Sequence, residues 1–271
     1  MDNRPIGVFD SGVGGLTGLK ALREMLPEEN YIFFSDAGRC PYGPRPKEEL
    51  RRIALQDMDF LASLGVKAIL SACGTISSTA HAELDGYPIP AFGVLKPALE
   101  AMAAIGGDGP LAILATEASI RSGRFTDALR ELCPGREVIG VPCPRFVSLV
   151  QEEARTDPED PILQAAVAEA LAALRERRPA AALLGCTHFG FIAEAIGRFL
   201  GEDVRLISAS ECGARALRDN LIKNGRLGEG GSCRFYTSGD AAAFNEFAGR
   251  YLETGPIRAA EVPVMEVEKS L

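Results

Sequence analysis

The feature that most constrains this chain is a regular alternation between short apolar runs and longer amphipathic runs. In the first 73 residues the apolar runs PIGVFD, NYIFFSD and VKAILSAC are separated by GLTGLKALREML and KEELRRIALQDMDFLASLG. The apolar runs have the length of strands, and the amphipathic runs have the length and periodicity of helices. The order is therefore β-α-β-α-β, which predicts an α/β fold.

The predicted strands lack the polar alternation of a sheet that faces water on one side. Continuous apolar strands are typical of parallel sheets that helices cover on both faces. The helix-end signals agree, because Gly65 follows a predicted helix and Asp160 with Pro161 offers an N-cap before a first-turn proline. We expect a doubly wound, mostly parallel architecture.

The two halves of the chain resemble each other. The matching segments are RPIGVFDSG with GPLAILATE, and VKAILSACGT with AAALLGCTH. This internal repeat predicts two similar doubly wound α/β domains. The strand-like segments DVRLIS and FYTSGD come later still, so the tail is expected to return to the first sheet. We place the first domain at 1–97 plus 208–271 and the second at 98–207.

Composition limits the classes of partner. The 271 residues contain 29 Lys and Arg against 37 Asp and Glu, a net charge of -8, which disfavours nucleic acid and anionic membranes as partners. The N-terminus has no signal-peptide pattern, and the most apolar stretch, ILQAAVAEALAAL, is short of the roughly 20 residues that a membrane span needs. Seven scattered cysteines fit reduced thiols better than a disulfide framework. We expect a cytoplasmic protein.

A glycine-rich turn, DSGVGGLTG, follows the first predicted strand and opens a helix. With Asp36 at the end of the next strand it resembles a dinucleotide fingerprint. However, Thr17 occupies the third glycine position, and Asp10 would place a carboxylate beside the pyrophosphate. A tight turn whose free N–H groups bind a smaller anion, such as a carboxylate beside Ser11, fits better.

Polar and reactive side chains collect at the predicted carboxyl edges of the strands, where ligands of open parallel sheets bind. The set comprises Asp10, Ser11, Cys73, Thr75, Thr116, Cys186, Thr187 and His188. Each half thus ends a strand in a cysteine. The other cysteines have no such setting and are interpreted as structural: Cys40, Cys133, Cys143, Cys212 and Cys233.

Three kinds of chemistry compete for these residues. Zinc is disfavoured, because Cys186 and His188 have no CxxC partner and His81 lies in a predicted helix. A cysteine hydrolase could use Cys186 and His188 but leaves Cys73 unexplained. Inversion of a stereocentre uses both cysteines, because a proton leaves one face of a carbon and another arrives on the opposite face. Asp10 and His188 are candidates for tuning the two thiols.

At these residues the chain resembles the glutamate racemases and the wider cofactor-independent aspartate/glutamate racemase family. The matching segments are FDSGVGGLT at 9–17, CPYG at 40–43, AC-x-T at 72–75, IPAFGVLKPA at 89–98, ILATEASIRSG at 113–123, LLGCTHF at 183–189 and FYTSGD at 235–240. The resemblance implies two similar α/β domains that close over a small acidic amino acid, with the active site in the cleft between them. It implies no cofactor and no metal, and it makes a homodimer a reasonable expectation.

The resemblance also assigns roles to residues. It implies that Cys73 and Cys186 act as acid and base at the Cα of glutamate, with Asp10 and His188 as their proton-handling neighbours. The substrate contacts that it implies are Ser11, Tyr42, Gly43, Gly74, Thr75, Thr116 and Thr187. In bacteria such a reaction supplies D-glutamate for peptidoglycan.

The chain departs from the family pattern at four places, one of which is Phe189-Gly190 after Thr187-His188, where the family has THYP. Gly74 replaces the usual Asn, Gln151 replaces the usual Glu, and Ser208-Ala209-Ser210 replaces an IDSG-like segment. A missing amide at position 74 is expected to weaken glutamate binding by about 1–3 kcal/mol, or roughly 5- to 150-fold. The departures leave two alternatives open: a racemase of aspartate or another small acidic compound, and an impaired family member that acts as a binding protein.

Overall fold

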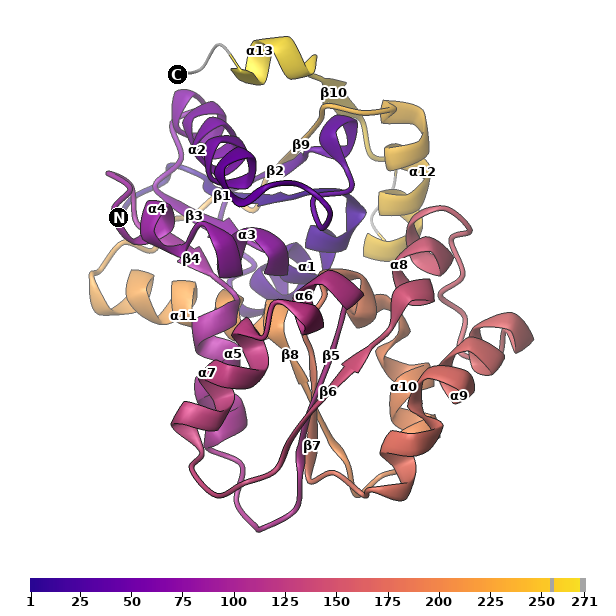
Figure 1. The fold of residues 1–271 in the computed structure, drawn as a ribbon. Helices are drawn as coiled ribbons and strands as arrows, with labels where there is room; N and C mark the ends of the chain where they lie inside the picture. Colours follow the sequence, from indigo (N-terminus) through magenta and orange to yellow (C-terminus); the bar gives the residue numbers. More distant parts are fainter. Residues whose placement is uncertain (254–255, 269–271) are drawn as a thin grey trace.

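The computed structural model describes residues 1–253 and 256–268, and within them the strands form two separate sheets (Figure 1). The first sheet has six strands in the order β10-β9-β2-β1-β3-β4, and every pairing in it is parallel. Its strands are β1 (Ile6–Asp10), β2 (Tyr31–Ser35), β3 (Ala68–Ser71), β4 (Ala91–Gly93), β9 (Cys233–Thr237) and β10 (Ala259–Glu261).

The second sheet is the lower of the two in Figure 1 and has four parallel strands in the order β6-β5-β7-β8. Its strands are β5 (Leu111–Ala115), β6 (Val138–Pro142), β7 (Ala181–Leu184) and β8 (Arg205–Ser208). The chain therefore builds most of the first sheet, then the whole second sheet, and then returns with β9 and β10. The boundaries 1–97 plus 208–271 and 98–207 stay predictions, and the first range includes 254–255 and 269–271, which lie outside the described residues.

Helices connect almost all of these strands. The helices are α1 (Leu16–Met25), α2 (Lys47–Ser63), α3 (Gly74–Thr79), α4 (His81–Asp85), α5 (Leu95–Ala103), α6 (Glu117–Arg121), α7 (Arg124–Leu132), α8 (Pro144–Gln151), α9 (Pro161–Glu176), α10 (Ala193–Leu200), α11 (Ala209–Lys223), α12 (Ala241–Leu252) and α13 (Val264–Glu268). Short 3-10 turns are η1 (Val13–Gly15), η2 (Ala37–Arg39) and η3 (Thr187–Ile192).

Apolar side chains cover both faces of the first sheet. In β1, Val8 belongs to one hydrophobic cluster and the next residue, Phe9, belongs to another on the opposite face. Because successive side chains of a strand point to opposite faces, both faces of this sheet are buried. The expectation of two doubly wound, parallel α/β domains is confirmed, and it explains why the strands read as continuous apolar runs.

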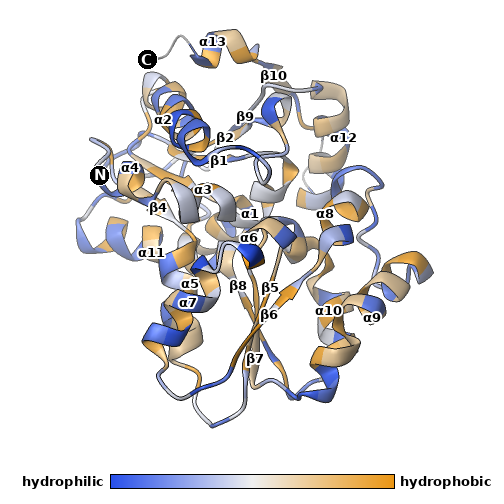
Figure 2. Cartoon of the chain, in the orientation of Figure 1, coloured by the Kyte–Doolittle hydropathy of each residue, from blue (hydrophilic) through white to orange (hydrophobic). Residues whose placement is uncertain are grey.

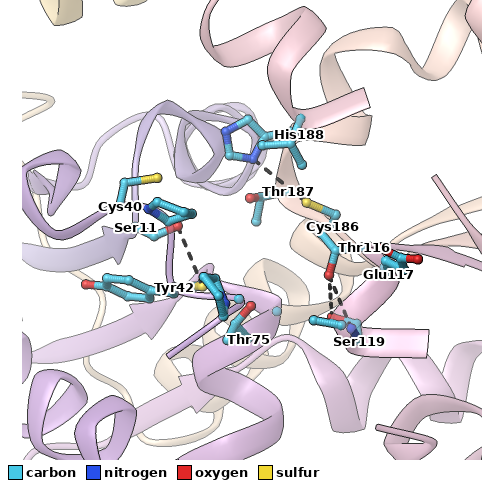
Figure 3. A pocket seen from close by; sticks show the side chains of 18 of the residues that line it. Ser11, Cys40, Tyr42, Thr75, Thr116, Glu117, Ser119, Cys186, Thr187 and His188 are labelled. Atoms are coloured by element: carbon cyan, nitrogen blue, oxygen red, sulfur yellow. Dashed lines mark hydrogen bonds between the residues drawn. The ribbon is translucent and has the colours of Figure 1, made fainter. Parts of the chain in front are cut away.

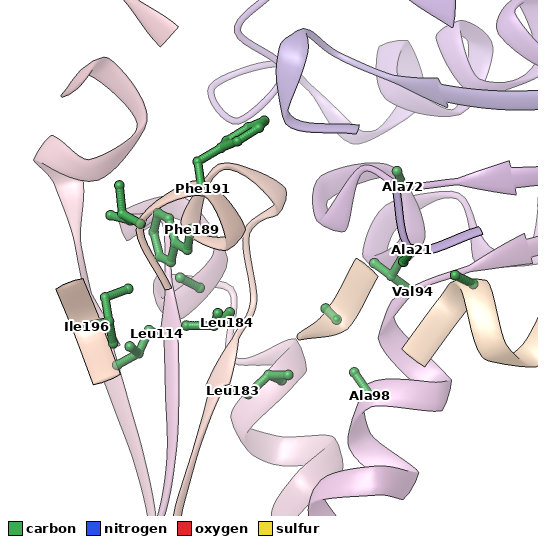
Figure 4. Packing of buried hydrophobic residues seen from close by; sticks show 14 of the residues in the cluster. Ala21, Ala72, Val94, Ala98, Leu114, Leu183, Leu184, Phe189, Phe191 and Ile196 are labelled. Carbon is green, nitrogen blue, oxygen red and sulfur yellow. The ribbon is translucent and has the colours of Figure 1, made fainter. Parts of the chain in front are cut away.

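The larger of the two clusters extends from the first sheet into the second. It includes Val94 and Ala98 near the junction, and Leu114 and Leu183 on the central strands of the second sheet (Figure 4). In Figure 2 these central strands are coloured as hydrophobic, whereas the outer helices carry polar faces. The two halves thus share apolar packing and leave their strand ends facing one another.

Local signals in the sequence set several helix ends. Gly65, just after α2, has φ +78, the left-handed conformation that glycine adopts without a steric cost. The Asp160 side chain accepts hydrogen bonds from the backbone N–H groups of Ile162 and Leu163 and so caps α9. Both predictions from the sequence are confirmed. Among the described residues, no helix is long and apolar enough to span a membrane.

Candidate active site

A cavity of about 360 Å³ opens between the carboxyl ends of the two sheets. Ten residues that the sequence singled out line it: Ser11, Tyr42, Gly43, Cys73, Gly74, Thr75, Thr116, Cys186, Thr187 and His188. In Figure 3, Ser11, Tyr42 and Thr75 lie on one side of the cavity, and Thr116 and Cys186 lie on the other. The cavity therefore has walls from both α/β halves. Gln151 and the segment 208–210 are not among the residues that line it.

Cys73 follows β3 and is the N-cap residue of α3, with a side chain that is 4% exposed. Its Sγ lies 4.0 Å from the Oγ of Ser11. Burial raises the pKa of the Cys73 thiol well above its ordinary value, and the nearby Asp10 carboxyl raises it further. Backbone N–H groups of Ile76 and Thr75 point toward the sulfur and partly oppose this rise in pKa, because they stabilise a thiolate.

Cys186 has the corresponding place in the second half. It follows β7 as the N-cap residue of η3, and burial raises its pKa to about 12. The backbone N–H of His188 and the hydroxyl of Thr187 oppose that rise. Each cysteine therefore combines a buried (Cys73) or partly buried (Cys186) side chain with donors from the turn that follows it, an environment in which a thiolate forms rarely but is a strong base.

Asp10 is the one predicted site residue that lies behind the cavity wall. Its side chain is fully buried at the end of β1, where Oδ1 accepts from the Gly12 N–H at 3.0 Å and Oδ2 accepts from the Thr187 hydroxyl at 3.3 Å. Burial raises the pKa of Asp10 to about 7. Because it raises the pKa of both Cys73 and Cys186, the carboxyl is close enough to influence both thiols.

The glycine-rich turn binds groups of the protein itself, which corrects the expectation that its N–H groups are free for a ligand. Gly12 donates to Asp10, and the Val13 N–H donates to Oε1 of Gln151 at 3.4 Å. Gly15 also donates to the Asp10 carboxyl. The turn is glycine-rich because it wraps closely around this carboxyl: a Cβ added at Gly15 would lie 2.5 Å from the Cβ of Asp10.

His188 lies between a thiol and an amide. Its Nδ1 is 3.8 Å from Sγ of Cys186, and its Nε2 is 2.8 Å from Oε1 of Gln151. The imidazole is 4% exposed, and this burial lowers its pKa to about 4. The ring is therefore neutral at physiological pH.

Tyr42 lines the cavity, but its hydroxyl points away from it (Figure 3). The hydroxyl lies within hydrogen-bond distance of the buried carboxyl groups of Asp36 and Asp57, and the Asp57 contact measures 3.0 Å. Arg39 pairs with both carboxylates at 2.6 Å. Burial raises the pKa of Tyr42 well above its ordinary value, so the phenol remains protonated. The network fixes the loop that carries Tyr42 and Gly43.

Gly74 lies at a point where the backbones of the two halves come close together. A Cβ added at Gly74 would meet the carbonyl oxygen of Gly185, directly before Cys186, at 2.8 Å. At Gly43, by comparison, an added Cβ would have an ordinary contact of 3.9 Å with Ala118. The missing side chain at position 74 therefore lets one backbone approach another, a role that the sequence did not reveal.

Cys40, which the sequence placed among the structural cysteines, also lines the cavity. Burial and the neighbouring Asp10 carboxyl raise its pKa to about 11. The sequence reasoning also missed Glu117, Ser119 and Arg121, which come from the segment after β5. The signal available was that both Cys40 and this segment lie in stretches that match the family pattern. Among the described residues, no group of three or more His, Cys, Asp or Glu side chains is arranged to hold a metal ion.

Comparisons with known proteins agree with this architecture. A model of the Asp/Glu/Hydantoin racemase family matches residues 18–217. A glutamate racemase from Geobacter metallireducens is 36% identical to this chain over 257 residues, which cover 93% of this chain and 94% of the relative.

Solved structures give the same result. A glutamate racemase isoform from Bacillus anthracis superposes with a TM-score of 0.88 and 31% identity, covering 97% of this chain and 99% of that one. A glutamate racemase from Francisella tularensis, solved in complex with D-glutamate, gives a TM-score of 0.85 and 32% identity with the same coverage. Fold and relatives together define an isomerase of the racemase class. The chain belongs to the Asp/Glu/Hydantoin racemase family.

Proposed function

We propose that this enzyme interconverts L- and D-glutamate without a cofactor, with Cys73 and Cys186 as the two catalytic bases. The observation that carries the proposal is that each sheet has a cysteine two residues after the end of one strand, and both cysteines line the same cavity. The named activity of the relatives in the family supports glutamate as the substrate.

In the proposed reaction, the thiolate of one cysteine removes the Cα proton of the substrate. The electron pair of that C–H bond is delocalised into the α-carboxylate, and the thiol of the other cysteine delivers its proton to the opposite face of Cα. One S–H bond forms and one breaks, so the two cysteines exchange protonation states in each turnover. Burial supports this role, because a desolvated thiolate is a stronger base than one in water.

Substrate recognition is proposed to combine side chains and backbone from both halves. Ser11, Thr75 and Thr187 offer hydroxyls around the two cysteines. Tyr42 and Gly43 would contact the substrate through their backbone, because the Tyr42 hydroxyl is held by buried carboxylates.

Two further residues that line the cavity, Thr116 and Arg121, have different proposed roles. Thr116 caps α6 through its side chain and so fixes the cavity wall. Arg121 is the one Lys or Arg among the described residues that line the cavity, which suits a substrate with two carboxylates.

The test is racemisation of L- and D-glutamate by purified enzyme, followed by optical rotation, with L- and D-aspartate in parallel and no added cofactor. Cys73→Ala and Cys186→Ala are each expected to abolish racemisation while the circular dichroism spectrum is retained. The matched control is Cys212→Ala, which removes a thiol from α11, away from the residues that line the cavity.

Three results would contradict the proposal. If either active-site variant kept more than a small fraction of the parent activity while folded, the two-base assignment would be wrong. If the parent turned over aspartate but not glutamate, the substrate assignment would be wrong, and if it turned over neither, the chain would be a binding protein. With glutamate as substrate, the enzyme would supply D-glutamate for peptidoglycan.

A further inference from the structure

The buried His188 ring has a polar neighbour at each nitrogen, although only one of the two neighbours belongs to the proposed base pair. Nδ1 faces the Cys186 thiol at 3.8 Å, and Nε2 faces the side-chain amide of Gln151 at 2.8 Å. Gln151 ends α8, 37 residues before His188 in the chain, and does not line the cavity. A neutral imidazole has one nitrogen that carries a hydrogen and one that carries a lone pair, so these contacts determine which of the two nitrogens is protonated.

The amide atom that faces His188 is identified by a second contact. The backbone N–H of Val13 points at the same Gln151 atom at 3.4 Å. A backbone N–H only donates, so the shared atom must be the carbonyl oxygen Oε1 and not the amide nitrogen. An oxygen without hydrogen can only accept, and Nε2 of His188 must therefore carry the proton. Nδ1 then carries a lone pair, which is directed at the Cys186 thiol.

We infer that Gln151 is a positioning residue that holds His188 as the neutral Nε2–H tautomer, so that the Cys186 thiol donates to Nδ1. The inference builds on the proposed function, since it describes one of the two proposed bases. Its consequence is that His188 orients the Cys186 proton toward a fixed acceptor without itself carrying charge.

The charge of the residue at position 151 is central to this arrangement. A carboxylate in place of the amide would favour the imidazolium form, because an opposite charge at this distance stabilises it. The neutral amide gives no such stabilisation, and burial lowers the pKa of His188 to about 4. The ring also has the thiol of Cys186, the aromatic ring of Phe191 and the backbone of Gly14 beside it. None of these supplies a negative charge at neutral pH, given the raised pKa of Cys186.

The experiment is nitrogen-15 NMR of the imidazole rings in the full-length enzyme with labelled histidine. The chain has two histidines, and an exposed His81 can be replaced by His81→Gln to leave His188 alone. In the parent, His188 is expected to show a protonated Nε2 and an unprotonated Nδ1 throughout pH 5.5 to 8, the working range that we choose around the ordinary His pKa of about 6.5.

Two variants test the role of Gln151. Gln151→Glu is expected to raise the His188 pKa by about one to three pH units. Gln151→Met removes the acceptor at similar size and is expected to give a mixture of both tautomers. The matched control is Gln164→Glu, the same change at an exposed position of α9, which should leave the His188 signals where they are in the parent.

A parent spectrum with a protonated Nδ1, or an imidazolium at pH 7, would overturn the inference. So would a His188 signal that is unchanged in both Gln151 variants. These NMR measurements require folded enzyme but no turnover, so their outcome is independent of the activity assays. Loss of the two-cysteine mechanism with an intact Nε2–H signal would refute the proposed function alone.

Discussion

Gly74→Ala tests whether the close approach of the two halves matters for turnover. The added Cβ would lie 2.8 Å from the Gly185 carbonyl oxygen, whereas ordinary contacts begin at 3.4 Å, so the backbones must separate by about 0.6 Å (3.4 minus 2.8). Overpacking of this kind costs about 1–3 kcal/mol. Because the strain falls beside both Cys73 and Cys186, we expect kcat/KM for glutamate to fall by roughly 5- to 150-fold.

Gly74→Asn adds the same Cβ and a side-chain amide, and it is the change that the sequence alone would favour. A hydrogen bond from the amide to a substrate carboxylate is worth about 1–3 kcal/mol, similar to the steric cost. We therefore expect Gly74→Asn to recover part of the activity that Gly74→Ala loses, without exceeding the parent. The ratio of kcat/KM between Gly74→Asn and Gly74→Ala measures the effect of the amide. The ratio of kcat/KM between Gly74→Ala and the parent measures the effect of the steric contact with the Gly185 carbonyl.

The assay is glutamate racemisation at several substrate concentrations, with urea unfolding of each variant to separate lost activity from lost stability. The control is Gly249→Ala in α12, where an added Cβ meets no atom within 4 Å. If Gly74→Ala kept the kcat/KM of the parent, the argument that position 74 has no room for a Cβ would be refuted. If Gly74→Asn raised kcat/KM by 5-fold or more, the lower end of about 5- to 150-fold, the missing amide would matter more than the steric contact.

Three further predictions concern charge. Lys67→Met leaves the buried Glu29 without its partner at 2.6 Å and should lower the free energy of unfolding by about 3–5 kcal/mol in urea titrations, whereas a loss below about 1 kcal/mol would refute the argument. Burial raises the pKa of Asp10 to about 7, so ionisation of this carboxyl destabilises the fold as pH rises from about 4 to about 7. The stability of Asp10→Asn relative to the parent should therefore be greater at pH 8 than at pH 5. A stability difference that does not change with pH would contradict this. Arg121→Ala should lower kcat/KM by roughly 1.5- to 5-fold at low salt, with no difference at high salt, in keeping with about 0.2–1 kcal/mol for an exposed charge.

The fold could be predicted from the sequence because one physical rule governs most of it. A strand buried on both faces has no polar side, and β1, β2, β5 and β7 accordingly read as unbroken apolar runs. The two cysteines could be predicted for a related reason: parallel strands bring their carboxyl ends to one edge, so residues far apart in sequence collect there.

The contacts that tune the site could not be predicted in the same way. Gln151 reaches His188 from a different helix, and Tyr42 turns its hydroxyl toward Asp57 on α2. Such side-chain directions depend on how helices pack, which periodicity does not encode. The position of Gly74 is a further example, because a glycine next to a proposed catalytic cysteine is read as a lost substrate contact until the facing Gly185 carbonyl is located.

The two half-sites are alike in backbone and different in side chains, and this difference has a kinetic consequence. Cys73 faces a serine hydroxyl at 4.0 Å, and Cys186 faces an imidazole at 3.8 Å, so the two thiols hold their protons with unequal strength. Enantiomers have equal free energy in water, so kcat/KM for the L and D substrates must be equal whatever the site looks like. If the two cysteines are the catalytic bases, we expect their inequality to appear as different kcat values for the two directions of racemisation, and any such difference must be matched by a proportional difference in KM.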